Sequence, residues 1–536
     1  MPKAAHRLSK SSHQLHTSHS SLNLPPGPGL LDDLESPLDS ITTRSDTNPI
    51  QKPFGNLNLN SPAFIMSGFF PNDLLCLLLE GLVDDSPVLS QCALVNWDFN
   101  RAASRVLYSR VVLSPAFKPI ERGSMDGSTA LLSAASLPHN APYVQVLRIG
   151  GYLSTRPMSS DPLQEALLTA VKAFESLRIV EILPETYNSE LFTALLDEIK
   201  DRASLINLRV NSSCTDDARA PILAHIVGLR KLELKSSTRA ILQLLPDWLG
   251  RLTSLKELHL TSNCGSVTPG VLRSFIPLLQ NITAFSFGLS YSITDDDLFS
   301  FLGQLPCLET VQLQHYLQFK SPEDGTPMKC LRSLTVLHHP SDDLDNVDRI
   351  CAWVIRAISG SPIERIQICC HEFDDSTFAP RSFDALIEHL SRTNSGTLRA
   401  LDLGGWLISD SSVSLLFSTC VALEEFTAAL DIAGFNMFTS LLPRMEHLHT
   451  AALQVYETFS ASAEDAARLM QSNRTLRRLS INNLRTEGSW ISQGDGVHFF
   501  VQEFGGPNTN DEVPVSPRAV AAAQHAPAMD VILEED

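Results

Sequence analysis

Several clusters of acidic, histidine and cysteine residues have the chemistry to hold a metal ion. They are the runs Asp295-Asp296-Asp297, Asp342-Asp343 and Cys369-Cys370-His371. Calcium loops alternate oxygen ligands and end in a spaced glutamate, and neither acidic run has that pattern. The cysteine cluster lacks a second ligand pair, and the ten cysteines contain no Cys-x-x-Cys. We therefore expect no metal and no cofactor, and we expect Asp295 to cap a helix that begins near Leu298.

No motif in the sequence indicates a catalytic centre. The chain lacks the glycine-rich phosphate loops, the Gly-x-Ser-x-Gly nucleophile elbow and the His-Glu-x-x-His metal motif. His338 and His339 come at the end of an expected strand, where we expect a solvent-exposed pair. Catalysis would require groups that converge from distant parts of the chain. We therefore predict a non-catalytic binding protein.

A repeated arrangement of leucines determines the expected architecture. The segment from Gly228 to Asn263 contains Leu-x-x-Leu-x-Leu twice, beginning at Leu229 and at Leu255. A period in this range with three leucines at this spacing is typical of a leucine-rich repeat, in which a short strand is followed by a return segment. One unit cannot cover its own apolar side chains, so the units must stack into an array.

The same apolar pattern recurs through residues 140–500. About thirteen irregular units begin at Val144, Leu177, Leu205, Leu229, Leu255, Ile282, Leu308, Leu331, Ile363, Leu398, Leu423, Leu448 and Leu476. Many return segments have helical patterning, and helices on the outside make the outer face wider than the inner one. We predict an α/β fold, a leucine-rich-repeat solenoid with a curved parallel sheet on its concave side and helices outside. Insertions are expected between His338 and Asn394.

The side chains that face the concave side can be identified, because neighbouring residues of a strand alternate in direction. The position between the last two apolar residues of each unit gives a column: Arg148, Glu181, Arg209, Glu233, His259, Ser286, Gln312, Thr335, Gln367, Asp402, Thr427, Ala452 and Ser480. It lacks the arginine cluster of a phosphate-reading site. The candidate substrate face is Arg148, Glu181, Arg209, Glu233, His259, Gln312, Gln367 and Asp402. A merely solvated surface is the alternative.

The ends of the chain differ in composition from the array. Residues 1–64 are rich in Ser, Pro, Asn and His, residues 505–536 end in an acidic cluster, and neither segment shows apolar periodicity. We predict that both are disordered. Between residues 68 and 113 apolar side chains fall at helical spacing in three short stretches, which predicts a small helical module. Because its first stretch is apolar nearly all round, we expect this module to have a second partner.

The helical module resembles an F-box of the fungal, basidiomycete-like kind. The matching residues are Phe70, Pro71, Asn72, Asp73, Leu74, Leu75, Leu78, Leu82, Leu89, Cys92, Val95 and Phe99. Phe70 replaces the usual first Leu, Phe99 replaces the usual terminal Trp, and residues 84–86 lengthen the first loop. An F-box followed by leucine-rich repeats is a known family layout. A simple helical cap on the end of the array is the alternative.

The resemblance implies a role in an SCF-type ubiquitin ligase. The F-box would dock on the Skp adaptor, and through it on a cullin, while the repeats would bind a target protein for ubiquitination. The motif positions carried over to the adaptor interface are Pro71, Leu74, Leu75, Leu78, Leu82, Val95 and Phe99, some of which must also form the core of the module. The alternative function is a leucine-rich-repeat scaffold or GTPase-regulator-like protein that joins no ligase.

Charge and hydropathy narrow the classes of partner. The formal net charge of −19 disfavours nucleic acid and anionic membranes, both of which require a basic footprint. No run of about 18 apolar residues occurs, and the first residues lack the apolar stretch of a secretory signal. We therefore expect a protein of the cytoplasm or nucleus, or of both.

Overall fold

The computed structural model describes residues 71–114, 124–152, 162–186, 189–315, 327–338, 345–370, 383–456, 461–493 and 496–504. Both segments that we predicted to be disordered lie outside these ranges. Phe70, His339, Asp342-Asp343 and His371 lie outside them as well.

Three short helices form the first part of the described chain: α1 (Asn72–Glu80), α2 (Ser86–Cys92) and α3 (Trp97–Leu107). Side chains cap two of them, because Asp85 accepts a hydrogen bond from the backbone N–H of Val88 at 3.1 Å and Asn96 accepts one from that of Phe99 at 2.9 Å. The helices enclose a hydrophobic cluster of their own: Leu75, Cys76, Leu79, Leu89, Ala102, Ala103 and Val106. This cluster is separate from the core of the repeats.

The rest of the described chain forms one sixteen-stranded sheet whose strands follow each other in chain order. They are β1 (Arg110–Leu113), β2 (Val146–Tyr152), β3 (Ile179–Thr186), β4 (Asn207–Val210), β5 (Lys231–Lys235), β6 (Glu257–Asn263), β7 (Ala284–Leu289), β8 (Thr310–His315), β9 (Ser333–His338), β10 (Arg365–Cys370), β11 (Ala400–Ile408), β12 (Glu425–Leu430), β13 (Thr450–Val455), β14 (Arg478–Ile481), β15 (Leu484–Gln493) and β16 (Gly496–Phe504). β1 to β14 pair in parallel, and β15 and β16 add an antiparallel hairpin.

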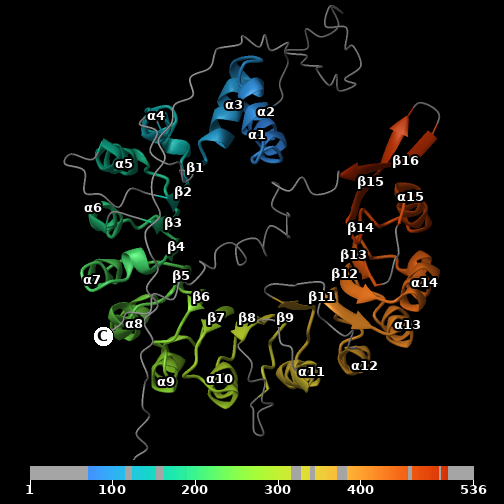
Figure 1. Cartoon of the computed structure of the whole chain (residues 1–536). Helices are drawn as coiled ribbons and strands as arrows, with labels where there is room; N and C mark the ends of the chain where they lie inside the picture. The colour runs from blue at the N-terminus through green and yellow to red at the C-terminus, as the bar shows by residue number, and fades with distance from the viewer. Residues whose placement is uncertain are drawn as a thin grey trace, which may run out of the picture. The chain divides into compact units, whose positions relative to one another are not determined.

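Helices return the chain from strand to strand. They are α4 (Ser124–Ala135), α5 (Pro162–Ala173), α6 (Ser189–Ile199), α7 (Ala220–Leu223), α8 (Arg239–Arg251), α9 (Pro269–Phe275), α10 (Asp295–Leu302), α11 (Asp345–Ile358), α12 (Asp384–Thr393), α13 (Asp410–Thr419), α14 (Ile432–Leu441) and α15 (Ala463–Ser472), with 3₁₀ turns at Ala141–Tyr143, Ser212–Cys214, Ile276–Leu278 and Leu442–Arg444. They lie on the convex side of the curved sheet, and the strands line its concave side (Figure 1). Because helices are wider than strands, this arrangement produces the curvature.

The repeat pattern accounts for the sheet. Each of the thirteen repeat starts is followed two residues later by a strand, from β2 after Val144 to β14 after Leu476. The three repeat leucines at Leu229, Leu232 and Leu234 are completely buried between the sheet and the helices. The predicted fold class, a solenoid with a parallel inner sheet and outer helices, is confirmed. The sheet extends beyond the pattern at both ends, because β1 lies inside the range expected for the helical module and β15 and β16 lack the leucine spacing.

Two expectations about single residues were wrong. Asp295 does not cap α10, because Thr294 is the N-cap and forms a reciprocal capping box with Asp297. Asp295 instead lies buried and accepts a hydrogen bond from the indole N–H of Trp353 at 2.9 Å. His338 is not exposed, since only 2% of its surface is accessible and its ring packs against Trp406 at a centroid distance of 5.5 Å.

Candidate functional site

The column predicted for the concave face is continuous in the structure. Arg148 pairs in register with Glu181, Glu181 with Arg209, Arg209 with Glu233, and Glu233 with His259. The same register continues through Ser286, Gln312, Thr335, Gln367, Asp402, Thr427, Ala452 and Ser480. The sheet therefore brings all eight candidate substrate-face residues into one row. Whether they contact a substrate stays a prediction.

Alternating charges at the start of this row neutralise each other. Arg148 Nε lies 3.2 Å from Glu181 Oε2, and Arg209 lies 4.0 Å from Glu181 and 2.8 Å from Glu233. The side chains of Arg209 and Glu233 are only 16% and 12% exposed, so water screens them little. Each charge has an opposite neighbour on an adjacent strand. This network stabilises the local geometry and leaves little net charge for a ligand.

A second polar group lies around His259. Its Nδ1 is 2.6 Å from the hydroxyl of Ser286, and its Nε2 is 3.2 Å from a carboxylate oxygen of Glu257. Lys231 Nζ lies 2.9 Å from the same carboxylate. The hydrogen bond with His259, assisted by Lys231, lowers the pKa of Glu257 to about 2. The carboxylate therefore remains charged over the physiological pH range and is already paired.

A third group joins β9, β10 and β11. The hydroxyl of Thr335 donates to Gln367 Oε1 at 3.5 Å, and Gln367 Nε2 donates to Asp402 Oδ2 at 3.1 Å. The backbone N–H of Gly404 donates to Asp402 Oδ1 at 2.9 Å. Burial raises the pKa of Asp402 even though these two donors act in the opposite direction. Gln312 lies between Ser286 and Thr335 in the same row. The middle of the row thus offers hydrogen-bonding groups with little charge.

The positions that match the F-box motif divide between surface and core. Pro71, Leu74, Leu78 and Val95 are exposed, with accessible fractions of 40%, 59% and 63% for the last three. Leu75 is buried in the core of the helical module, and Leu82 and Phe99 pack against that core while partly exposed. Four of the seven predicted adaptor contacts are therefore exposed to solvent, and Leu75 is not accessible. Adaptor binding itself stays a prediction.

Other exposed apolar side chains on the same module were not selected from the sequence. They are Leu77, Leu94 and Trp97, with accessible fractions of 64%, 86% and 86%. Leu74, Leu77 and Leu78 are spaced by three and four residues, which places them on one face of α1. Leu94 and Val95 lie in the turn between α2 and α3, and Trp97 is the first residue of α3. The helical spacing between Leu74 and Leu77 could have predicted that Leu77 shares the exposed face. The turn has no periodicity from which exposure could be predicted.

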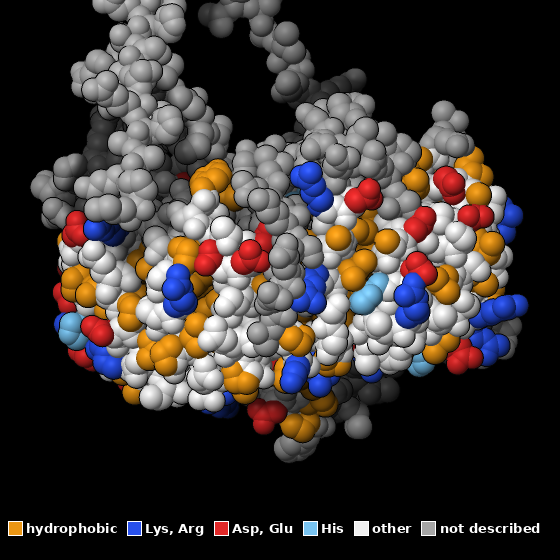
Figure 2. All heavy atoms as spheres, turned by 90° about the horizontal axis from the view of Figure 1, so that it is seen from below, with side chains coloured by type: hydrophobic (Ala, Val, Ile, Leu, Met, Phe, Trp, Pro, Cys, Tyr) orange, Lys and Arg blue, Asp and Glu red, His pale blue; other side chains and the backbone are white. Residues whose placement is uncertain are grey.

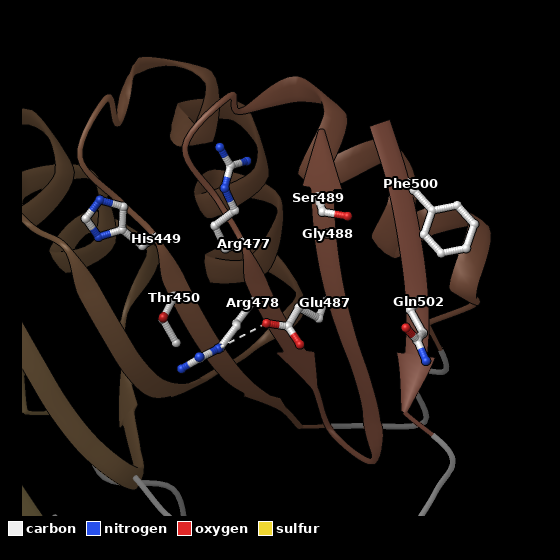
Figure 3. A pocket seen from close by; sticks show the side chains of 9 residues that line it. All are labelled: His449, Thr450, Arg477, Arg478, Glu487, Gly488, Ser489, Phe500 and Gln502. Carbon is white, nitrogen blue, oxygen red and sulfur yellow. Dashed lines mark ion pairs between the residues drawn. The ribbon is translucent and has the colours of Figure 1, made fainter. Parts of the chain in front are cut away.

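A hollow of about 550 Å³ lies at the C-terminal end of the inner face. Its lining comes from β13 to β16 and the residues that precede two of those strands: His449, Thr450, Arg477, Arg478, Glu487, Gly488, Ser489, Phe500 and Gln502. Arg478 and Glu487 form an ion pair of 3.6 Å across β14 and β15 (Figure 3). The Phe500 ring is 55% exposed. This combination of cations, an aromatic ring and polar groups is suited to binding a ligand, and the repeat pattern did not predict it.

Other kinds of site have less support. Within the described ranges no three His, Cys, Asp or Glu side chains form a group that could hold a metal ion. Of the helices in those ranges, none combines the length and the apolar character needed to cross a bilayer. The face in Figure 2 intersperses Lys and Arg with Asp and Glu and with small groups of hydrophobic side chains. That face shows no single-sign charged region.

The chain matches no protein-family model and no curated protein. Solved structures that resemble it include an internalin from Listeria monocytogenes (13% identity, 74% of this chain and 94% of that one, TM-score 0.27). They also include the yeast Rad7 and Elc1 complex (12%, 76% and 88%, TM-score 0.34) and the leucine-rich-repeat-containing protein LegL7 from Legionella pneumophila (13%, 68% and 97%, TM-score 0.32). Scores this low add nothing to what the repeats and the sheet establish by themselves.

Proposed function

We propose that the protein is a substrate-recognition subunit of an SCF-type ubiquitin ligase. The three-helix module would dock on a Skp-type adaptor, and through it on a cullin, while the repeat array binds a target protein. The chain would contribute no chemistry of its own. It would hold the target at high effective concentration near the ubiquitin carried by the ligase.

The observation that carries the proposal is the large amount of apolar surface on a module that already has a core. Leu77, Leu78 and Val95 are each more than half exposed, although Leu75, Leu79 and Leu89 fill the interior between the helices. Exposed leucines in this number are costly unless a partner covers them. A helical cap on the array needs a polar outer surface, so the exposed leucines favour a docking module over a cap.

The test is binding of a purified Skp-type adaptor to the full chain and to the double variant Leu74→Asp with Leu78→Asp. Both side chains are exposed, so the variant should fold, whereas a charge buried against the adaptor without a partner should weaken binding by about 30-fold or more. Val421→Asp is the matched control, because Val421 is 60% exposed and lies in the repeat array. Equal adaptor binding by the double variant and the control would contradict the F-box assignment.

A further inference from the structure

Some basic side chains of the array form ion pairs with carboxylates, and others do not. Several arginines in the first three quarters of the array pair with glutamates. Arg148 and Arg209 share Glu181, and Arg365 makes two hydrogen bonds to the Glu425 carboxylate, at 2.7 and 3.2 Å. Arg399 likewise contacts Glu424. These pairs leave little net charge on that part of the face.

At the C-terminal end of the face two arginines without a carboxylate partner lie close to a third arginine, Arg478, that has one. Arg477 and Arg485 are exposed, and no carboxylate among the described residues lies within 4 Å of their guanidinium groups. The Arg477 guanidinium donates only to the backbone carbonyl of Arg474, at 3.2 Å. Glu487 is the acidic group that lines the hollow, and it is shared with Arg478. A chain with a net charge of −19 therefore carries a local cationic surface at this point.

The shape of the hollow restricts the form of a ligand. It crosses four strands, β13 to β16, which span about 14 Å at the usual strand spacing of about 4.8 Å. That length equals about four residues of an extended peptide. Phe500 offers an exposed ring beside Ser489 and Gln502, whose polar side chains can hydrogen-bond to a peptide backbone (Figure 3). The hollow is partly open to solvent, so a linear segment can lie across its strands.

We infer that this end of the array binds an anionic linear segment of the target protein. Carboxylate or phosphate groups of the segment would lie on Arg477 and Arg478, and an apolar side chain of the segment would lie on Phe500. Guanidinium groups form strong charge-assisted hydrogen bonds with both kinds of anion. Nucleic acid is a poorer fit, because the cationic groups are few and the chain as a whole repels polyanions. This inference rests on the proposed function in one respect, namely that the repeat array is the part that binds the target protein.

The test measures fluorescence anisotropy of labelled hexapeptides added to the full chain. The three probes alternate Leu with Glu, Leu with phosphoserine, and Leu with Lys. We expect the two anionic probes to bind, more weakly at 300 mM than at 50 mM salt, and the Lys probe not to bind. The stronger of the two anionic probes identifies the source of the negative charge. Equal binding of all three probes, or tighter binding of a single-stranded oligonucleotide, would overturn the inference.

Matched variants locate the binding. Arg477→Glu with Arg478→Glu should weaken the anionic probes by about tenfold or more. The control is Arg178→Glu with Arg230→Glu. These two arginines are exposed and, like Arg477, each directly precedes a strand. The backbone N–H of each donates to a backbone carbonyl of the preceding repeat, at 2.9 Å for Arg178, 2.7 Å for Arg230 and 2.8 Å for Arg477. The control should stay within about twofold of wild type, and equal losses in both double variants would contradict the assignment to the hollow.

Adaptor binding measured on the same variants separates this inference from the proposed function. We expect both charge-reversal variants to bind the Skp-type adaptor like the wild type, because the arginines lie in the array. A chain that binds the anionic probes but no adaptor would refute the ligase role and leave the peptide site standing. A chain that binds the adaptor but none of the probes would refute the peptide site alone.

Discussion

The pKa values of two carboxyl groups on the inner face are shifted in opposite directions, and the direction of each shift determines how its charge affects stability. Glu257 is held in its charged form by His259 and Lys231, and its pKa falls to about 2 from an ordinary value of 4.5. Asp402 lies in a more enclosed position, where burial raises its pKa above 3.8. At neutral pH the charge on Glu257 therefore stabilises the fold, whereas the charge on Asp402 opposes it.

The first prediction follows from the sign of these shifts. Glu257→Gln should lower the urea midpoint at pH 7, and the loss should shrink as the pH falls from 4.5 towards 2, where the unfolded and then the folded carboxyl become protonated. Asp402→Asn should raise the midpoint at pH 7, because it removes a charge that the folded state disfavours. That gain should vanish below pH 3.8, where both states are already protonated.

Urea unfolding followed by circular dichroism at pH 7 and pH 3 measures both effects. Glu309→Gln serves as a control for amide substitution, because Glu309 is exposed and no described residue forms an ion pair with it. A loss of stability for Asp402→Asn at pH 7 would mean that its hydrogen bonds with Gln367 and Gly404 outweigh the cost of burying its charge.

Among the elements, the parallel pair β6 and β7 shows how the sheet accommodates an irregular repeat. The pairing register shifts between Leu260 and Asn263, and Ser262 there has a left-handed backbone with φ of 60°. The backbone of Ser262 turns towards Gly288 on β7. A side chain at Gly288 would lie 2.7 Å from the Ser262 nitrogen and would clash with its carbonyl oxygen. Only glycine leaves room for this approach.

Gly288→Ala should therefore destabilise the array by roughly 1–3 kcal/mol, the usual cost of forcing extra volume into a packed site. Gly396→Ala is the matched control, because no heavy atom lies within 4 Å of the added methyl group. Differential scanning fluorimetry of the two variants should show a lower melting temperature for Gly288→Ala alone. An unchanged melting temperature would mean that β6 can move away without cost.

The sequence predicted the elements that obey the leucine spacing and failed where long-range contacts decide. Three leucines per unit specify both the strand and its buried face, so the row from Arg148 to Ser480 follows directly. Asp295 is buried against Trp353, and His338 is buried against Trp406. Each partner belongs to a different repeat, so the spacing within one repeat could not predict these contacts. The hollow is formed largely by β15 and β16, which have no repeat leucines. The sequence could not show that Leu74 is exposed and Leu75 is buried, because α1 has apolar residues on both faces.

For the molecule as a whole, the described chain combines two hydrophobic cores of very different size. The array has a continuous core that each repeat shares with its neighbours, so its stability accumulates along the sheet. The helical module encloses seven buried apolar residues, and Leu74, Leu77, Leu78 and Leu94 are exposed on its surface. Domains this small have marginal stability without a partner. A binding partner for the module would therefore also serve as part of its fold.

This difference predicts an uneven response to the adaptor in hydrogen exchange measured by mass spectrometry. In the chain alone, amides of α1 to α3 should exchange faster than those of β5 to β10, because the small core opens at lower free-energy cost. Adaptor at 100 times its Kd should stabilise the module by about 2.7 kcal/mol, which slows exchange in α1 to α3 by about 100-fold when opening is local. Amides of β5 to β10 should be unaffected. If Leu74→Asp with Leu78→Asp kept this protection, adaptor binding would not depend on these two leucines, which would contradict the F-box assignment.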